Sequence, residues 1–207
     1  MRENDPNQNS SRRDFLRGSS VAAATAVLSQ TAQAAAEEAN AEALALQELP
    51  VATGTVKVTL QVNGKPMTTE IEPRSTLLDV LRHRLDVTGP KRVCDRASCG
   101  ACTVMLNGQS VYSCTSLAIA AQGKEIRTLE SFDTGPNGVP HAFHQNDGLM
   151  CGYCTPGFVT ACQALLEKNP NPTLEEVRKG LDGNICRCGT YVGVVKAALE
   201  AAKAIKV

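Results

Sequence analysis

Nine cysteines, all placed between Cys94 and Cys188, constrain what this 207-residue chain can fold into more than any other feature. The first 93 residues contain none of them. Because the count is odd, at least one cysteine stays outside any set of disulfide pairs. The clustering and the odd count together argue against a pure disulfide framework.

The rest of the composition is that of a globular chain with a small-residue core. Hydrophobic residues make up 43% of the sequence, but aromatic residues only 3%, and there is no Trp. A core of Ala, Val and Leu in small domains gains from a covalent or metallic staple. The formal net charge is zero, so the basic excess expected of a nucleic-acid-binding protein is missing.

Residues 1–34 have the layout of an export signal. Arg12 and Arg13 precede a mildly apolar stretch over residues 21–28, and Ala-Gln-Ala at 32–34 fits a small-x-small cleavage site. The arginine pair followed by Phe-Leu is typical of the twin-arginine type. The apolar stretch is too short for a spanning helix, so no stable membrane span is expected. The alternative is a positively charged disordered tail.

An Ala/Glu-rich linker over residues 35–53 leads to the first predicted domain, which covers residues 54–131. Alternation of apolar and polar residues predicts a strand over 56–62, and Asn63-Gly64 predicts a hairpin to a return strand over 67–71. A helix follows, with Thr76 and Asp79 at capping-box spacing, Leu77, Leu78, Leu81 and Leu85 on one face, and Gly89-Pro90 at its end. Three further strands are expected over 102–106, 109–112 and 124–127. These elements predict a small α+β domain.

The second predicted domain covers residues 132–207 and is helical. A Gly-Pro-Asn-Gly breaker at 135–138 marks the boundary. One helix carries Phe158, Ala161, Cys162, Leu165 and Leu166 on one face, a second begins at a Thr173–Glu176 capping box, and a third runs over 191–205 with Val192, Val195, Leu199 and Ala202 on one side. Short helices joined by short loops favour a small antiparallel bundle.

Four cysteines of the first domain have the spacing of a metal cluster site. Cys94, Cys99, Cys102 and Cys114 follow the C-x4-C-x2-C…C pattern of a plant-type [2Fe–2S] site. Gly100 and its small neighbours let the backbone fold around a cluster, and the amides of such a loop donate to its sulfur atoms. Structural zinc usually has a paired knuckle on both sides, whereas Cys114 is single.

Four cysteines of the second domain form a less specific set. The pairs Cys151/Cys154 and Cys186/Cys188 have spacings that fit a zinc site equally well. A thioredoxin-like redox pair would need a surrounding βαβ pattern that is missing here. Each pair precedes a predicted helix, whose N-terminus favours thiolates and an anionic cluster. Cys162 lies on an apolar helix face and is interpreted as a buried core residue.

With both cysteine sets in this order, the chain resembles the iron–sulfur subunits of the xanthine oxidase family of molybdenum hydroxylases. It is most similar to the iron–sulfur subunit of a periplasmic aldehyde oxidoreductase. The resemblance extends from about Thr55 to the C-terminus. It is carried by Cys99-Gly100-Ala101-Cys102-Thr103-Val104, Cys151-Gly152-Tyr153-Cys154-Thr155-Pro156-Gly157 and Cys186-Arg187-Cys188-Gly189.

The resemblance implies a β-grasp, plant-ferredoxin-like domain followed by a four-helix domain, each with one [2Fe–2S] cluster on its four cysteines. It implies that electrons pass from a molybdenum–pterin cofactor on a large partner subunit to flavin, on a possible FAD subunit, or to an external acceptor. Cys188 matches the cysteine closest to the pterin. Met150 occupies the position where the family usually has a glutamine that contacts the pterin. Ala97 and Val93 occupy positions where the first cysteine loop often has glycine.

These features predict a periplasmic electron-transfer subunit that is folded, loaded with clusters and exported by the twin-arginine route. The substrate chemistry is expected on another chain, with an aldehyde as substrate. An N-heterocycle hydroxylase is the first alternative. A free-standing ferredoxin and a secreted protein stabilised by zinc or disulfides are the others; the last of these predicts a colourless protein.

Overall fold

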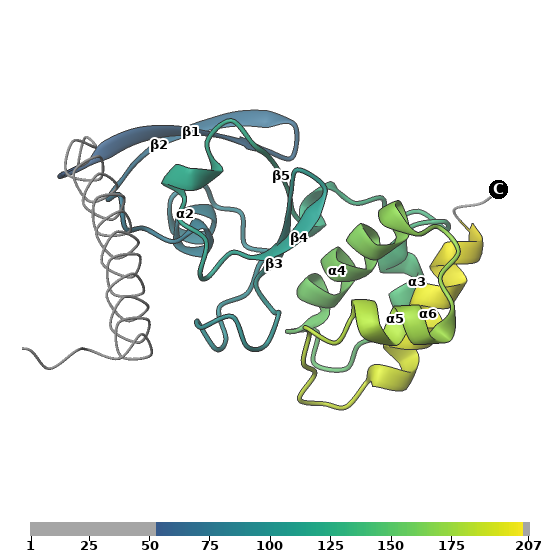
Figure 1. Cartoon of the computed structure of the whole chain (residues 1–207). Coiled ribbons are helices and arrows are strands. Elements are labelled where there is room, and N and C mark those ends of the chain that lie inside the picture. Colours follow the sequence, from purple (N-terminus) through teal and green to yellow (C-terminus); the bar gives the residue numbers. More distant parts are fainter. Residues whose placement is uncertain (1–52, 205–207) are drawn as a thin grey trace, which may run out of the picture. The chain divides into compact units, whose positions relative to one another are not determined.

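The computed structural model describes residues 53–204, and the strands come first along this part of the chain (Figure 1). Strand β1 (Val56–Val62) pairs in antiparallel register with β2 (Lys65–Ile71). The two turn residues, Asn63 and Gly64, have φ angles of 51° and 77°. Positive φ at both positions is the mark of a type I′ turn, so the predicted Asn-Gly hairpin is confirmed.

Within residues 53–204 the strands form one five-stranded mixed sheet in the order β2-β1-β5-β3-β4. The short strand β5 (Glu125–Arg127) runs parallel to β1 and antiparallel to β3 (Thr103–Leu106), which pairs with β4 (Gln109–Tyr112). Helix α2 (Leu77–His83) buries its apolar face in the same core as the inward side chains of β1. A mixed sheet covered by one helix is the predicted β-grasp architecture.

Helix α2 ends earlier than the sequence pattern predicts. We expected it to continue to Gly89-Pro90, but its C-cap is Arg84. Asp86, with a φ of 56°, takes the left-handed conformation that terminates a helix, and the amide of Val87 donates to the carbonyl of Leu81. Leu85 is still buried, at 8% exposed, because the irregular chain after the helix folds back onto the core.

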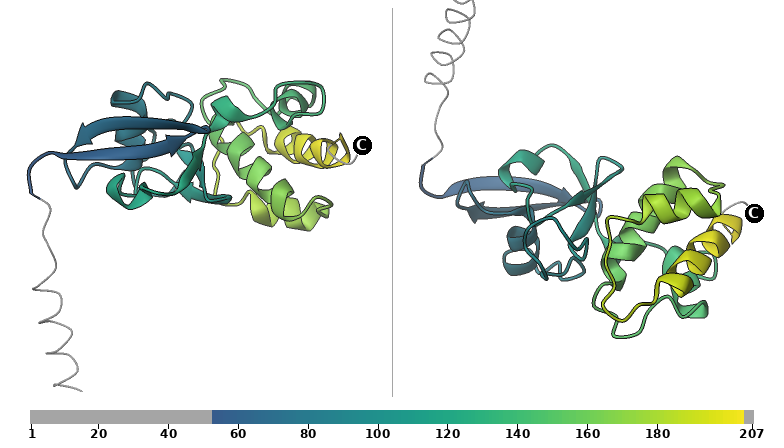
Figure 2. Two further views of the ribbon diagram at one scale, coloured as in Figure 1. Left: turned by 90° about the horizontal axis from the view of Figure 1, so that it is seen from above. Right: turned by 60° about the horizontal axis from the view of Figure 1, so that its bottom comes forward.

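Four helices make up the second half of the described chain, and they are α3 (Val139–Gln145), α4 (Thr155–Lys168), α5 (Leu174–Gly180) and α6 (Tyr191–Ala204). Helix α4 is buried almost all round. Helices α3 and α6 pack on each other, as Figures 1 and 2 show from three directions. The sequence pattern placed the last three helices but assigned no separate helix at α3. The predicted helical second domain is confirmed.

Helix α6 buries a different face from the predicted one. The core side of α6 is built from Val194 and four alanines, at positions 197, 198, 201 and 202. Of the predicted face, only Ala202 is buried, and Val192 is 71% exposed. The alanines form the buried face because their small side chains allow α6 to lie close to α3 and α4.

The two halves of the described chain share a packed contact. Helix α4 lies against β3, whose Met105 belongs to the core of the helical half. At the edge of this contact Arg127 forms an ion pair with Glu167 at 2.8 Å, and Lys168 donates to the side-chain oxygen of Gln109 at 2.5 Å. Two short 3-10 helices, η1 (Ile119–Ala121) and η2 (Leu129–Ser131), complete the connections. No helix in residues 53–204 combines the length and apolar character needed to cross a membrane.

Candidate metal centres

The first cysteine set lies on the loop between α2 and β3 and at the end of β4. Cys102 directly precedes β3, and Cys114 lies two residues after the end of β4. Three loop residues between Cys94 and Cys102 adopt left-handed conformations, which are Asp95 (φ 58°), Ala97 (φ 55°) and Gly100 (φ 71°). Successive turns of this kind point backbone N–H groups toward the enclosed space. Of the two positions where the family often has glycine, Ala97 takes a positive φ and Val93 does not.

Backbone amides of this loop donate to the cysteine sulfurs. The amide of Ala97 donates to Sγ of Cys114 at 3.3 Å, and the amide of Ser98 donates to Sγ of Cys94 at 3.4 Å. Burial raises the pKa of Cys94, but hydrogen bonds from backbone amides outweigh it and bring the pKa down to about 7. Burial, with the nearby thiol of Cys114, raises the pKa of Cys102 to about 12. The loop is thus built to stabilise negative charge on sulfur at its exposed side.

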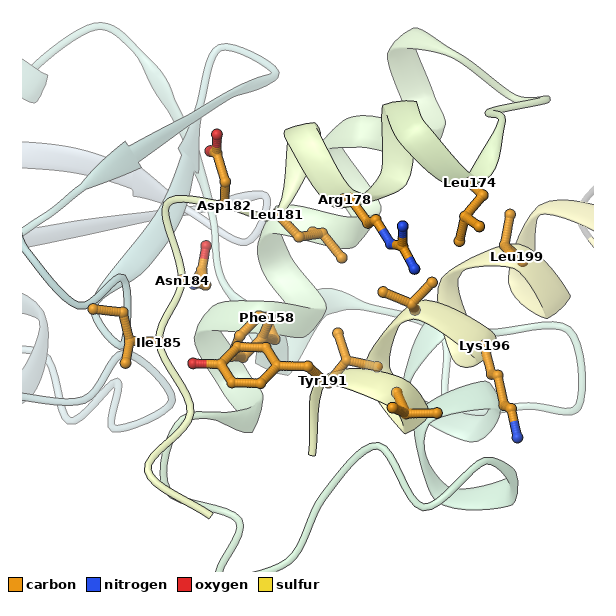
Figure 3. Close-up of a pocket in the computed structure, with 13 residues that line it drawn as sticks. Phe158, Leu174, Arg178, Leu181, Asp182, Asn184, Ile185, Tyr191, Lys196 and Leu199 are labelled. Atoms are coloured by element: carbon orange, nitrogen blue, oxygen red, sulfur yellow. The ribbon is translucent and has the colours of Figure 1, made fainter. Parts of the chain in front are cut away.

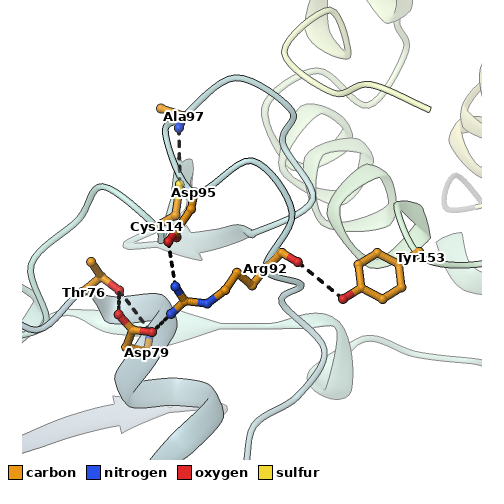
Figure 4. A network of polar contacts seen from close by, with 7 residues as sticks. All are labelled: Thr76, Asp79, Arg92, Asp95, Ala97, Cys114 and Tyr153. Atoms are coloured by element: carbon orange, nitrogen blue, oxygen red, sulfur yellow. Dashed lines mark hydrogen bonds and ion pairs between the residues drawn. The ribbon is translucent and has the colours of Figure 1, made fainter. Parts of the chain in front are cut away.

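A polar network fastens this loop to α2. Arg92 forms an ion pair with Asp79 of α2 and a second one with Asp95, at 2.6 Å (Figure 4). The hydroxyl of Thr76 donates to the Asp79 carboxylate at 2.7 Å, so the N-cap of α2 is tied into the same network. On the other side, the hydroxyl of Tyr153 donates to the carbonyl of Arg92 at 3.4 Å. Tyr153 lies between Cys151 and Cys154 of the second cysteine set, so the network connects the loops of the two sets.

The second cysteine set sits on two loops that each lead into a helix. Cys154 is the N-cap of α4, and Cys186 and Cys188 precede α6. Burial raises the pKa of Cys186, but the hydroxyl and amide of Thr190 outweigh it and lower the pKa to about 7, with the hydroxyl 3.1 Å from Sγ. Burial and the neighbouring Cys186 raise the pKa of Cys154 to about 12. The amide of Cys186 also donates to the hydroxyl of Tyr191 at 2.9 Å, which holds this loop on α6.

The eight thiols approach one another in four pairs. In each pair one thiol is close enough to shift the pKa of the other: Cys99 acts on Cys94, Cys114 on Cys102, Cys188 on Cys151 and Cys186 on Cys154. Among residues 53–204, no three His, Cys, Asp or Glu side chains converge as the ligands of a single metal ion do. A [2Fe–2S] cluster instead takes four thiolates, two on each iron. Two pairs in each domain therefore fit this group.

Several residues that shape the sites were not singled out by the sequence analysis. Arg92 and Thr190 support the two sets as described above, and Asn184 and Tyr112 join the loops that carry them. Arg92 could have been found as a charged residue two positions before Cys94. Thr190 could have been found as a hydroxyl residue four positions after Cys186. The contacts of Asn184 and Tyr112 bridge residues far apart in sequence and leave no local pattern.

Comparisons with known proteins place the two cysteine sets in two known domain types. Residues 60–129 match the 2Fe-2S iron-sulfur cluster binding domain, and residues 128–199 match the [2Fe-2S] binding domain. Residues 9–29 match the twin-arginine translocation pathway signal sequence; this segment, and with it the predicted signal peptide, lies outside the described residues.

Relatives of known activity share most of the chain. The aldehyde oxidoreductase iron-sulfur-binding subunit PaoA of Escherichia coli K12 is 38% identical, with 94% of this chain and 89% of that protein covered. The chain belongs to the iron–sulfur subunits of the xanthine oxidase family. Among solved structures of this family, quinoline 2-oxidoreductase from Pseudomonas putida 86 has a TM-score of 0.70 and 33% identity, covering 74% of this chain and 98% of that one.

A second solved structure of the family shows the same fold inside a longer protein. The aldehyde oxidoreductase of Desulfovibrio desulfuricans has a TM-score of 0.68 and 37% identity, covering 72% of this chain but 17% of that chain. The part of this iron–sulfur subunit that carries its eight cysteine ligand candidates therefore corresponds to a small segment of a large enzyme. The predicted α+β and helical architecture of the family is confirmed.

The helical half of this chain has an apolar groove beside α5 and α6, with a volume of about 530 Å³ (Figure 3). Its walls include Leu174, Val192, Val195 and Leu199. Val195 and Leu199 are only partly buried against the core, so they also line this groove. Phe158 and Tyr191, which pack edge to face with ring centroids 6.2 Å apart, close the end nearest the cysteines. The groove contains no cysteine.

Proposed function

We propose that this chain is the electron-transfer subunit of an exported molybdenum hydroxylase that oxidises aldehydes. The observation that carries the proposal is the arrangement of eight cysteines as one set of four in each of two cluster-binding domains. Paired thiols suit two irons, and an electron carrier needs centres that change charge without a large rearrangement. In this proposal the substrate chemistry belongs to another chain, because PaoA, which aligns with 94% of this chain, is named as an iron-sulfur-binding subunit.

In this proposal each cysteine set holds one [2Fe–2S] cluster. The ferredoxin-like domain, residues 54–131, uses Cys94, Cys99, Cys102 and Cys114, and the helical domain, residues 132–207, uses Cys151, Cys154, Cys186 and Cys188. Each cluster supplies a centre that accepts and releases one electron. The residues of the chain supply the thiolates, the amide donors at Ala97 and Ser98, and the Thr190 hydroxyl beside Cys186.

A large molybdenum-binding subunit is the proposed partner, and the second cysteine set is the proposed side of contact. Cys151 is exposed, and Met150 and Val192 are 73% and 71% exposed. Apolar side chains gathered around a redox site mark a docking surface. We place Cys188 and Met150 toward the pterin of the partner. The thioether of Met150 offers only a weak acceptor, so it cannot replace the donor of a glutamine amide.

The aldehyde substrate is favoured over an N-heterocycle by the extent of the match. PaoA, which is named as part of an aldehyde oxidoreductase, aligns with 94% of this chain. In the same comparison of sequences, the nicotine 6-hydroxylase small subunit of Paenarthrobacter nicotinovorans aligns with 73% of it. We propose that electrons leave the subunit for flavin, on a possible FAD subunit, or for an external acceptor.

We place the assembled enzyme in the periplasm. The match to a twin-arginine signal supports this location. Exported thiols are normally oxidised to disulfides, whereas thiolates already bound to iron are protected. Export of a folded, loaded subunit reconciles the nine cysteines with an oxidising compartment.

The test is an electron paramagnetic resonance spectrum of the dithionite-reduced protein with spin quantitation. We expect two distinct S = 1/2 signals, each near one spin per chain, from a red-brown protein. A single signal would mean that the second set holds another metal, with zinc as the first candidate. A colourless protein without signals would overturn the electron-transfer function.

A further inference from the structure

The two cysteine sets are joined by a short seam of hydrogen bonds. Residues 99–100 and Tyr112 form its first side, and residues 183–185 form the second. The amide of Ile185 donates to the carbonyl of Cys99 at 2.9 Å. The side-chain amide of Asn184 donates to the carbonyl of Gly100 at 2.9 Å, and the hydroxyl of Tyr112 donates to the carbonyl of Gly183 at 2.9 Å. One side of the seam carries cysteines of the first set, and the other leads directly into Cys186.

The Gly100 carbonyl is the centre of this seam. It accepts from the Thr103 hydroxyl at 2.6 Å and from the Thr103 amide at 3.1 Å, in addition to Asn184. Asn184 is only 6% exposed. A buried amide that loses its acceptor is left desolvated and unpaired, which is unfavourable, so this contact resists opening.

Packing around the seam leaves no free space. A Cβ on Gly100 would lie 2.5 Å from the Asn184 side chain and 2.6 Å from the Gly183 carbonyl. A Cβ on Gly157, in the first turn of α4, would lie 2.2 Å from the Gly100 carbonyl. Such close approach of three backbone segments means that a movement of one cysteine loop is transmitted to the other.

We propose that Asn184 is a positioning residue that fixes the spacing and orientation of the two cysteine sets. The inference rests on the proposed function, because it concerns two bound clusters. Gly100 lies between Cys99 and Cys102, and Asn184 lies two residues before Cys186. A single side chain therefore connects a ligand loop of one domain to a ligand loop of the other, and electron exchange between two centres depends steeply on their separation.

The test uses two substitutions of similar shape in the full cluster-loaded chain. Asn184→Leu keeps the branched outline but removes the donor, and Asn184→Asp replaces the donor by an oxygen that repels the Gly100 carbonyl. The matched control is Lys168→Met, which removes the contact to Gln109 between the same two domains but away from the cysteine loops. The readouts are iron content, the g values of the two signals, and the magnetic interaction between the reduced clusters, measured as splitting or relaxation enhancement.

We expect both Asn184 variants to keep about four iron atoms per chain and two signals. Their magnetic interaction should change from that of wild type, whereas Lys168→Met should reproduce wild type. An unchanged interaction and unchanged g values in both Asn184 variants would overturn the proposal. Loss of one cluster in both variants would also overturn it, since Asn184 would then hold a ligand loop and not a spacing. Fewer than two signals in wild type would instead overturn the proposed function.

Discussion

Cys154 and Cys162 lie eight residues apart on the same stretch of chain but have opposite surroundings. Cys154 is the N-cap of α4 and lies within reach of Cys186. Cys162 is 0% exposed in the apolar core, and burial alone raises its pKa to about 12. A thiol held protonated among apolar side chains is a packing residue, so the expected core role of Cys162 agrees with its burial. The two cysteines form a matched pair for testing the ligand assignment.

Replacing each of these cysteines by alanine should separate ligand from core residue. We expect Cys154→Ala to lower the iron content from about four to about two atoms per chain and to remove one paramagnetic signal. Cys162→Ala should keep both signals and lose about 1 kcal/mol of stability through the small cavity it leaves. Iron analysis and spin quantitation on both purified variants measure this. Full iron in Cys154→Ala would contradict the second ligand set.

Ala97 carries backbone strain within the first cysteine loop. Its φ of 55° places the Cβ of a non-glycine residue in the disfavoured left-handed region, at a cost on the order of 1 kcal/mol. The amide of Ala97 donates to Sγ of Cys114, and glycine would keep this donor. The strain is therefore separable from the hydrogen bond.

Ala97→Gly should slow the loss of the first cluster in urea, because it relieves the left-handed strain and keeps the N–H donor. The decay of the cluster's visible absorbance at fixed urea concentration measures the effect. Ala101→Gly is the control, because Ala101 is 2% exposed and its φ is not positive. This second variant should lose its cluster faster than wild type, and equal decay in both variants would refute the strain argument.

At the scale of helices and strands, turns and helix caps that depend on neighbouring residues could be predicted from the sequence. The Asn63-Gly64 turn depends on two residues, and the capping box at the start of α5 depends on Thr173 and Glu176, which bond each other's backbone as predicted. The eight ligand candidates were also readable, since each set contains a close-spaced pair or triplet. Interactions within four residues leave a pattern that sequence alone displays.

Features that depend on contacts between residues far apart in the sequence could not be predicted from the sequence. The burial of alanines on α6 in place of Val192 and Leu199 depends on how closely neighbouring helices approach. The pairing of Cys151 with Cys188 joins loops before two different helices. Asn184 meets Gly100 across 84 residues of sequence. Each of these is a tertiary contact without a local period, which is why spacing rules missed them.

The cap of α5 provides a stability test for one element. The backbone and side chain of Thr173 both lower the pKa of Glu176. A carboxyl with a depressed pKa stabilises the folded state above its unfolded pKa, and this contribution is lost as pH falls through the folded value. The cap should therefore be fully formed at neutral pH and should weaken in acid.

Thr173→Ala should make the amides of α5 exchange with solvent faster at neutral pH, by about fivefold for a cap worth ~1 kcal/mol. Hydrogen exchange of the cluster-loaded protein, followed by mass spectrometry of α5 peptides, measures it. Glu175→Gln lies in the same turn but outside the capping box, so it should have a smaller effect. Equal exchange in wild type and Thr173→Ala would show that tertiary packing alone holds the helix.

At the scale of the whole molecule, the exposed apolar residues and the export signal bear on the order of assembly and export. Met150 and Val192 stand exposed beside the second cysteine set, and such surface favours association before the chain leaves the cell interior. The twin-arginine route is understood to carry folded proteins. We propose that the subunit binds its clusters and its large partner first, which satisfies both conditions and leaves the partner with no need of a signal of its own.

The joint replacement Arg12→Lys and Arg13→Lys tests this order of assembly. The paired arginines define the signal type, so the variant should stay in the cytoplasm with its clusters and with the large partner bound. Cell fractionation followed by iron analysis and pull-down of the tagged chain measures all three. Arg17→Lys, just outside the pair, should be exported like wild type. If the partner still reached the periplasm while the variant stayed inside, co-export would be wrong, because the partner would then carry its own means of crossing the membrane.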